Sequence, residues 1–348
     1  MSETPALLDE LLRAAAPSGH EAPAAAAWRE AASFAELDTD GLGSSVARIG
    51  EGSPLLAVVG HIDEIGLAVT HIDEKGLLHF LTIGGWDPQI LAGQRVVVAG
   101  RDGPVPGVVG RKPIHLLDAE QRKKVVEIRG MHIDIGAADR EQAEALVRVG
   151  DPAVIAAEPQ ALAGGRLVSR AMDNRLGAYV ALEALRRAEH GSVSGSLAAV
   201  AAVQEEIGLN GARTSAFSLE PDLAVVIDVT HATDVPGVEE KEHGSHPLGS
   251  GPVIGRGSTL SPKVFELLVE IAEEAGIEHT IEVSGRGTHT DADAIQISRS
   301  GIPTGLVSIP LRYMHSPVEM VDLADVEACV ELLVAFAERL DASVDLSR

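Results

Sequence analysis

The sequence contains little cysteine, few aromatic residues and little positive charge. One cysteine, Cys329, occurs in 348 residues, so no disulfide can form within the chain and a reducing, cytoplasmic location is expected. Cys329 lies in a run with helical spacing and is interpreted as a small core residue rather than a nucleophile. Aromatic residues make up 3% of the chain, which argues against the ring-lined surface expected of a cellulose binder.

Positive charge is scarce, with 28 Lys and Arg against 52 Asp and Glu and a net charge of −24. Nucleic acids and anionic membrane surfaces attract proteins through basic faces, so neither is expected as a partner. No apolar run is long enough to cross a bilayer. Residues 1–19 contain acidic residues and no long apolar run, so a signal peptide is not expected there.

Hydrophobic residues form 45% of the chain, enough for a large core and most naturally two domains. Up to residue 69, and again from residue 164, apolar strands alternate with amphipathic helices, which predicts a mainly parallel mixed sheet sandwiched by helices. Residues 70–163 differ, because short strands alternate there with Gly, Pro and Asp turns. The fold class is therefore α/β, with residues 1–69 and 164–348 forming a discontinuous domain and residues 70–163 an inserted β-rich domain.

Particular segments carry these expectations. Helices are expected over residues 5–16, 22–32, 140–149, 262–275, 288–298 and 325–340. Buried strands are expected over residues 55–59, 198–203, 223–227 and 305–309, and short strands of the insertion over residues 77–83, 95–99, 106–109 and 124–128.

Two adjacent carboxylates, Glu205 and Glu206, follow the apolar strand at residues 198–203. Ligand sites in open α/β sheets lie at the carboxyl ends of strands. Neighbouring side chains leave a strand on opposite faces, so the two glutamates are expected to differ in role unless the chain turns there. One could bind a metal and the other move a proton, whereas the simpler interpretation is a solvated pair at the start of a loop.

Four further polar residues stand at the ends of predicted elements: His61, Asp173, Asp228 and His315. Taken singly, each has a structural interpretation, such as a helix N-cap for Asp173. Together with Glu206 they form a set of two histidines and three carboxylates, suited to zinc, cobalt or manganese. One bridging carboxylate would leave one histidine and one carboxylate for each of two ions, the arrangement of a co-catalytic metal pair.

Asp63 follows His61 by two positions, so on a continuing strand its side chain points the same way. A carboxylate there can accept the second ring N–H of His61, as partners of metal-bound histidines commonly do. Asp291 and Asp293 are interpreted as helix-start residues.

Five short motifs surround these residues: His61-Ile62-Asp63-Glu64-Ile65-Gly66, Ala171-Met172-Asp173-Asn174-Arg175, Gln204-Glu205-Glu206-Ile207-Gly208, Ile227-Asp228-Val229-Thr230 and Arg312-Tyr313-Met314-His315-Ser316. They resemble the motifs of the tetrahedral (TET) and glutamyl aminopeptidase family, in the same order along nearly the whole chain. Members of that family are dinuclear metallo-aminopeptidases, some of them named cellulase-M-type endoglucanases.

The resemblance implies roles for individual residues. Asp173 would bridge two zinc or cobalt ions, with His61 and Asp228 completing one site and Glu206 and His315 the other. Glu205 would be the general base and Asp63 would orient His61. The insertion would be a PDZ-like oligomerisation domain in a homo-oligomer, expected as a hollow dodecamer, and the substrates would be short peptides.

Two alternatives remain open at this point. The chain could be a related dinuclear amidohydrolase or deacylase, with the same metal chemistry and a different substrate pocket. It could also be a non-catalytic scaffold, although a degenerate site should lack some of these residues. The preferred N-terminal side chain and the role of the acidic, His-containing segment at residues 234–246 are not indicated by the sequence.

Overall fold

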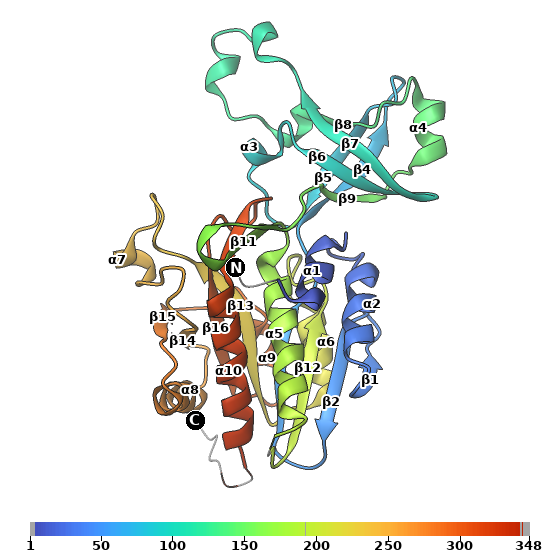
Figure 1. Ribbon diagram of the computed structural model, residues 1–348. Coiled ribbons are helices and arrows are strands. Elements are labelled where there is room, and N and C mark those ends of the chain that lie inside the picture. Colours follow the sequence, from blue (N-terminus) through green and yellow to red (C-terminus); the bar gives the residue numbers. More distant parts are fainter. Residues whose placement is uncertain (1–3, 192, 342, 344–348) are drawn as a thin grey trace.

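The computed structural model of the chain describes residues 4–191, 193–341 and 343. It consists of an α/β body and an inserted β-barrel that stands above the body in Figure 1. This architecture confirms the expected fold class. Residues 1–3 and 344–348, which fall within the expected discontinuous domain, lie outside the described residues, as do residues 192 and 342. No helix in the described part of the chain is long and apolar enough to span a membrane.

The body contains an eight-stranded sheet in the order β1-β2-β12-β3-β13-β16-β14-β15. Its four central strands, β12, β3, β13 and β16, run parallel, and β2 and β14 join them antiparallel. The central strands are apolar throughout because helices cover both faces. The bounds are β1 Glu36–Thr39, β2 Ser45–Gly50, β3 Leu55–His61, β12 Ser196–Ala202, β13 Leu223–His231, β14 Val253–Gly257, β15 Thr280–Ser284 and β16 Thr304–Leu311.

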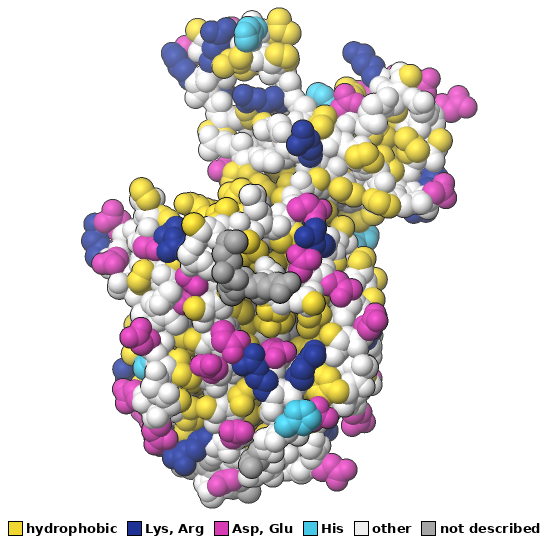
Figure 2. Space-filling model, viewed as in Figure 1, with side chains coloured by type: hydrophobic (Ala, Val, Ile, Leu, Met, Phe, Trp, Pro, Cys, Tyr) yellow, Lys and Arg dark blue, Asp and Glu magenta, His cyan; other side chains and the backbone are white. Residues whose placement is uncertain are grey.

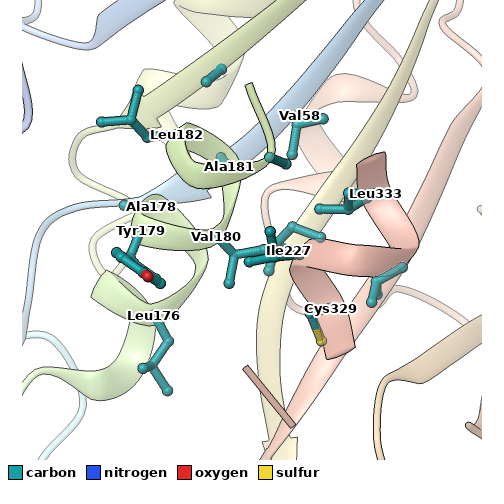
Figure 3. Packing of buried hydrophobic residues seen from close by; sticks show 14 of the residues in the cluster. Val58, Leu176, Ala178, Tyr179, Val180, Ala181, Leu182, Ile227, Cys329 and Leu333 are labelled. Carbon is teal, nitrogen blue, oxygen red and sulfur yellow. The ribbon is translucent and has the colours of Figure 1, made fainter. Parts of the chain in front are cut away.

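Helices cover the sheet on both sides. The larger core lies beneath α1 (Ala6–Arg13), α2 (Ala22–Ala31), α5 (Met172–Ala188), α8 (Pro262–Ala275) and α10 (Leu323–Arg339). A second core lies beneath α6 (Asn210–Leu219) and α9 (Ala292–Ile295). Cys329 of α10 is buried near α5 and β13, as expected for a core residue (Figure 3).

Two glycines allow α5 to approach the central strand closely. A Cβ atom on Gly60 of β3 would come within 2.3 Å of the carbonyl carbon of Gly177. A Cβ atom on Gly177 would come within 2.5 Å of the carbonyl oxygen of Ile227 on β13. Because no larger residue fits at either position, the N-terminal end of α5 is held against the ends of β3 and β13.

The insertion is a closed antiparallel barrel with its own apolar core. Its strands are β4 Gly66–Ile72, β5 Leu78–Ile83, β6 Arg95–Gly100, β7 Gly103–Arg111, β8 Met131–Asp134 and β9 Pro152–Ile155, and its helices are α3 Pro88–Leu91 and α4 Arg140–Leu146.

The strand expected over residues 124–128 is wrong. Between β7 and β8 the chain leaves the barrel in an exposed arm that contains the short 3₁₀ turns η1 (Ile114–Leu116), η2 (Gln121–Lys123) and η3 (Ile128–Gly130). The β-branched pair Val125 and Val126 suggested a strand, but a strand forms only where a neighbouring strand can pair with it. The strand instead begins at Met131, opposite Arg111 of β7.

A small third sheet joins β10 (Gln160–Ala161), β11 (Arg166–Ser169) and β17 (Glu319–Asp322), preceded at β11 by the turn η4 (Ala163–Gly165). Ser169 pairs with Glu319 in antiparallel register. This pairing brings the chain just before α5 beside the chain just after His315.

The helix expected over residues 288–298 is much shorter than predicted. Only α9, a single turn, is helical, and residues 288–290 form a loop. The side chain of Asp293 accepts the backbone N–H groups of Thr288 and His289, which bends the loop back on the helix. Such local side-chain bonds compete with helix formation.

Candidate metal centre

The predicted site residues meet at the carboxyl ends of the central strands. His61 is the last residue of β3 and pairs in register with Ala202, the last residue of β12. Glu205 and Glu206 are the third and fourth residues after β12, and Asp228 lies in the carboxyl-terminal half of β13. Parallel strands end at one edge of the sheet, so side chains far apart in sequence converge there.

Asp173 lies between the two histidines. Its Oδ1 is 3.2 Å from Nε2 of His61, and its Oδ2 is 3.3 Å from Nε2 of His315. Nε2 of His315 also lies 3.3 Å from Oε1 of Glu206. Each oxygen of one carboxylate therefore faces a different histidine, the disposition that a bridging ligand requires.

Three groups of residues could each hold a metal ion, because the ligand atoms within each group lie within 4.8 Å of one another. They are His61 with Asp173 and Asp228, Asp173 with Glu206 and His315, and His61 with Glu205 and Glu206. Asp173 is common to the first two groups. The mixed nitrogen and oxygen donors fit divalent ions such as zinc or cobalt.

The second ring nitrogen of each histidine faces an acceptor. Nδ1 of His315 donates to the carbonyl oxygen of Gly85, at 2.8 Å. Nδ1 of His61 lies 3.4 Å from Oδ1 of Asp63 but makes no hydrogen bond in this geometry. Asp63 is a fully buried carboxylate whose Oδ2 accepts the hydroxyl of Ser18 at 2.6 Å. Acceptors at Nδ1 leave both Nε2 atoms directed at the carboxylate cluster, as metal-binding histidines require.

The electrostatics of the cluster favour a cation. Burial, with the charges of Asp228, Asp291 and Glu206, raises the pKa of Glu205 to about 9. Burial likewise raises the pKa values of Glu206 and Asp228. Crowded carboxylates in a buried space repel one another, and a bound divalent ion removes that repulsion.

The pKa values of the two histidines are raised by the charges of the same carboxylates. Burial lowers the pKa of His315, but the adjacent Asp173 and Glu206 outweigh burial and raise that pKa to about 11. Burial also opposes the charge of His61, whose pKa is nonetheless raised by Glu205, Asp173 and Asp63. The carboxylates around each imidazole therefore favour positive charge at this position.

Backbone strain is concentrated around the cluster. Five non-glycine residues adjoining the site or its cavity adopt left-handed backbone angles, with φ between 58° and 61°: Ala171, Gln204, His289, Tyr313 and His315. Such residues persist only where their surroundings enforce them, and they gather at functional sites. At Gln204 the turn allows both glutamates that follow β12 to reach the cluster.

Sequence reasoning missed Glu319, a fully buried carboxylate that holds the site together. Its Oε2 accepts the backbone N–H of Met172 at 2.7 Å and that of Asp173 at 3.3 Å. Its Oε1 accepts the backbone N–H of His315 at 2.9 Å. The only signal in the sequence was its place four residues after His315, because its function depends on the pairing of β11 with β17.

The arginine in the motif at residues 171–175 has a structural task. Arg175 is fully buried and its guanidinium lies 2.8 Å from Oε1 of Glu64. It also donates to the carbonyl oxygens of Leu11 and Ile62, and Glu64 pairs in addition with Arg170. This buried network fixes the end of α1 and the chain after His61 against the start of α5.

Asp291 is not the helix cap that its position suggested. It stands before α9 but makes no capping bond, and both of its carboxylate oxygens are buried without a hydrogen-bond partner. Burial raises its pKa to about 7. Asp293 accepts the bonds of the preceding loop instead.

The segment at residues 234–246 is held by polar contacts beside the edge of the sheet. Nε2 of His246 donates to the carbonyl oxygen of His243 at 2.9 Å, so Nδ1 accepts the hydroxyl of Thr280 at 2.7 Å. Asp234 pairs with Arg312, in the loop after β16. The short helix α7 (Glu240–His243) lies within this segment, which is structural by its contacts.

A cavity of about 350 Å³ opens at the cluster. Among the residues that the structure describes, no Lys or Arg side chain lines it. Its wall is formed by His61, Asp173, Glu205, Glu206, Asp228, Val229, Thr230, His231, Glu282, Thr288, His289, Thr290, Leu306, Ser308, Met314 and His315. All five expected metal ligands and Glu205 therefore face one shared space.

Known proteins are similar to this chain in sequence. The model of the M42 glutamyl aminopeptidase family matches residues 43–332. The lysyl aminopeptidase of Pyrococcus furiosus is 36% identical over 307 residues, which are 88% of this chain and 87% of that protein.

Solved structures agree. The TET aminopeptidase of a marine sediment Thaumarchaeota archaeon superposes with a TM-score of 0.93 at 37% identity, covering 97% of this chain and 96% of that one. The Pyrococcus horikoshii TET1 peptidase, which can assemble into a tetrahedron or a large octahedral shell, superposes with a TM-score of 0.86 at 34% identity, covering 96% and 99% of the two chains.

Proposed function

The chain belongs to the M42 glutamyl aminopeptidase family and is a peptidase hydrolase, and we propose that it removes N-terminal residues from short peptides with two divalent metal ions and a glutamate base. The observation that carries this proposal is the position of Asp173, whose two oxygens each face a histidine of a different donor group. The cavity beside it leaves room for a peptide end.

The donor set fits two ions. Asp173 would bridge them, His61 and Asp228 would complete one site, and Glu206 and His315 would complete the other. Zinc and cobalt suit this mixture of nitrogen and oxygen donors. When bound, such ions supply Lewis acidity that polarises a scissile carbonyl and acidifies water.

Glu205 would move the proton. Its Oε2 lies 3.8 Å from Nε2 of His61, and it lines the cavity. In the proposed reaction Glu205 takes a proton from the attacking water and returns it to the leaving amine nitrogen as the peptide C–N bond breaks. Asp63 would keep the imidazole of His61 oriented.

A panel of substrates tests the reaction class. Metal-reconstituted protein should hydrolyse aminoacyl-anilides and leave acyl-amino acids intact. Cleavage of acyl-amino acids alone would instead identify the related amidohydrolase or deacylase. Binding of either class without turnover would identify the non-catalytic scaffold.

The insertion supports a proposed homo-oligomer, by resemblance a dodecamer. It carries exposed apolar side chains, including Leu81, Leu116 and Val125 at 58–66% exposure. Lys and Arg side chains gather at its far end, above a body on which acidic side chains are widely scattered (Figure 2). Exposed apolar side chains are typical of surfaces that other subunits cover. The basic far end of the insertion and the acidic body would also attract each other between neighbouring subunits. A cytoplasmic location is also proposed, because the single, buried cysteine fits a reducing compartment.

A further inference from the structure

One acidic residue of the cavity has no role in the proposed reaction. Glu282 lines the cavity wall together with the expected ligands and base. It lies on β15, the edge strand of the sheet, which pairs only with β14. Along β15 the side chains alternate, so Ile281 and Val283 are exposed while Glu282 is half-buried.

A hydrogen bond fixes Glu282 next to the expected metal site. Oγ1 of Thr230 donates to Oε1 of Glu282, at 2.8 Å. Thr230 follows Asp228 by two positions on β13, so both side chains project from the same face of that strand. The carboxylate of Glu282 is therefore held in the cavity wall by Thr230, two positions beyond Asp228 on β13.

No cation within the described residues neutralises Glu282. It takes part in none of their salt bridges, and Thr230 is its one hydrogen-bond partner among them. His231 also lines the cavity, and burial together with the neighbouring His243 lowers its pKa, so that ring is neutral near pH 7. One oxygen of Glu282 is thus free to bind a positive group in the cavity.

We propose that Glu282 selects peptides whose N-terminal side chain is basic, Lys or Arg, an inference that rests on the proposed aminopeptidase function. With the scissile bond at the cluster, the methylenes of a Lys or Arg side chain would lie along Val229, Leu306 and Met314. The charged end would then pair with Glu282. An acidic side chain would meet this carboxylate in a cavity that no Lys or Arg of the described part of the chain lines.

The experiment compares kcat/KM for lysyl-, arginyl-, leucyl- and glutamyl-anilides. The metal-loaded wild type should prefer the lysyl and arginyl substrates. Glu282→Gln should lower kcat/KM for these two by about 10–100-fold, the worth of one charged hydrogen bond, and change the leucyl substrate by less than about threefold. Glu282→Lys should move the preference toward the glutamyl substrate. The exposed Glu278 lies outside the cavity, so Glu278→Gln should match the wild type.

The outcomes separate the two proposals. If Glu282→Gln lowers all four substrates equally at full metal content, or if the wild type prefers the leucyl or glutamyl substrate, the selection by Glu282 is overturned and aminopeptidase activity stands. If the metal-loaded wild type cleaves none of the anilides, the proposed function fails and the selectivity fails with it.

Discussion

Oδ1 of Asp63 accepts the backbone N–H of Glu205 at 3.1 Å. The same oxygen lies 3.4 Å from Nδ1 of His61, so one buried carboxylate contacts both an expected metal ligand and the backbone of the expected base. The N–H of Glu206 also reaches this side chain, at 3.3 Å from Oδ2. Asp63 thereby sets the position of the turn after β12 relative to the end of β3.

Replacing Asp63 should weaken metal binding. Asp63→Ala removes the acceptor at His61 and releases the backbone of Glu205, and loss of such an outer partner lowers metal affinity by about 10–100-fold. Metal titration calorimetry measures the affinity. Asp38→Asn, on the exposed strand β1, is the control and should bind as the wild type does. Unchanged affinity in Asp63→Ala would show that Asp63 does not orient His61.

Variants of the two adjacent glutamates should differ in the amount of metal they retain. Glu206→Gln removes a negative charge from a proposed ligand, so metal occupancy and activity should both fall. Glu205→Gln should retain metal while kcat falls by about 10²–10⁴-fold with little change in KM, the usual contribution of a general base. Elemental analysis beside steady-state kinetics measures both. The reverse pattern would exchange the two roles, and two active, metal-containing variants would place neither glutamate in the reaction.

Removal of metal should abolish activity and leave the fold largely intact. The donor side chains lie at the edge of a sheet whose two cores are apolar and buried, so the sheet does not need the ions to form. Chelation followed by circular dichroism and by activity assays with zinc or cobalt tests this expectation. Full activity in a sample verified as metal-free would contradict the dinuclear mechanism.

Particle mass tests the proposed assembly. Light scattering at micromolar concentration should give the mass of a dodecamer, and Arg substitutions at Leu81, Leu116 and Val125 together should reduce it. Arg substitutions at Leu37 and Leu42, on the body, serve as the matched control. A monomeric wild type would reject assembly, whereas a dimer would retain contacts by the insertion and exclude the hollow particle.

The stability of the fold should depend on pH through Asp325. This buried carboxylate accepts the N–H groups of Gly249 and Gly251, and burial raises its pKa to about 6. The folded state then holds the proton more tightly than the unfolded state, so stability falls as pH rises from about 4 to 6. The change is about 3 kcal/mol in the free energy of unfolding, since one pKa unit corresponds to about 1.4 kcal/mol.

Denaturant unfolding of Asp325→Asn across this range measures that contribution. The variant should lack the decrease seen in the wild type. Glu331→Gln, at an exposed position of the same helix, should keep the decrease. Identical pH profiles for the wild type and Asp325→Asn would mean that Asp325 does not titrate in this range.

Much of this arrangement was predictable because the central strands are apolar runs. Their ends could be located in the sequence, and the rule that parallel strands present ligands at their carboxyl ends then brought His61, Glu205, Glu206 and Asp228 together. The expected strand at residues 124–128 was wrong, because β-branched residues do not reveal whether a partner strand exists. The resemblance supplied the order of the motifs and, with it, their proposed roles.

Glu319 and Asp291 were beyond such reasoning. Glu319 acts through the register of β11 with β17, a pairing between distant segments that no local pattern encodes. Asp291 has the sequence context of a helix cap, yet its side chain is buried without a partner. Strand pairing between distant segments determines the role of Glu319, and burial determines that of Asp291. Neither strand pairing nor burial can be inferred from the adjacent residues in the sequence.

The position of the barrel within the chain has a consequence for synthesis on the ribosome. β3 emerges before the barrel, whereas its two neighbours in the sheet, β12 and β13, both emerge after it. A nascent chain that has just completed the barrel therefore carries an apolar strand with both edges unpaired, a form prone to aggregation. Early folding of the barrel supplies neither partner, so β3 stays unpaired at both edges until β12 and β13 have been made.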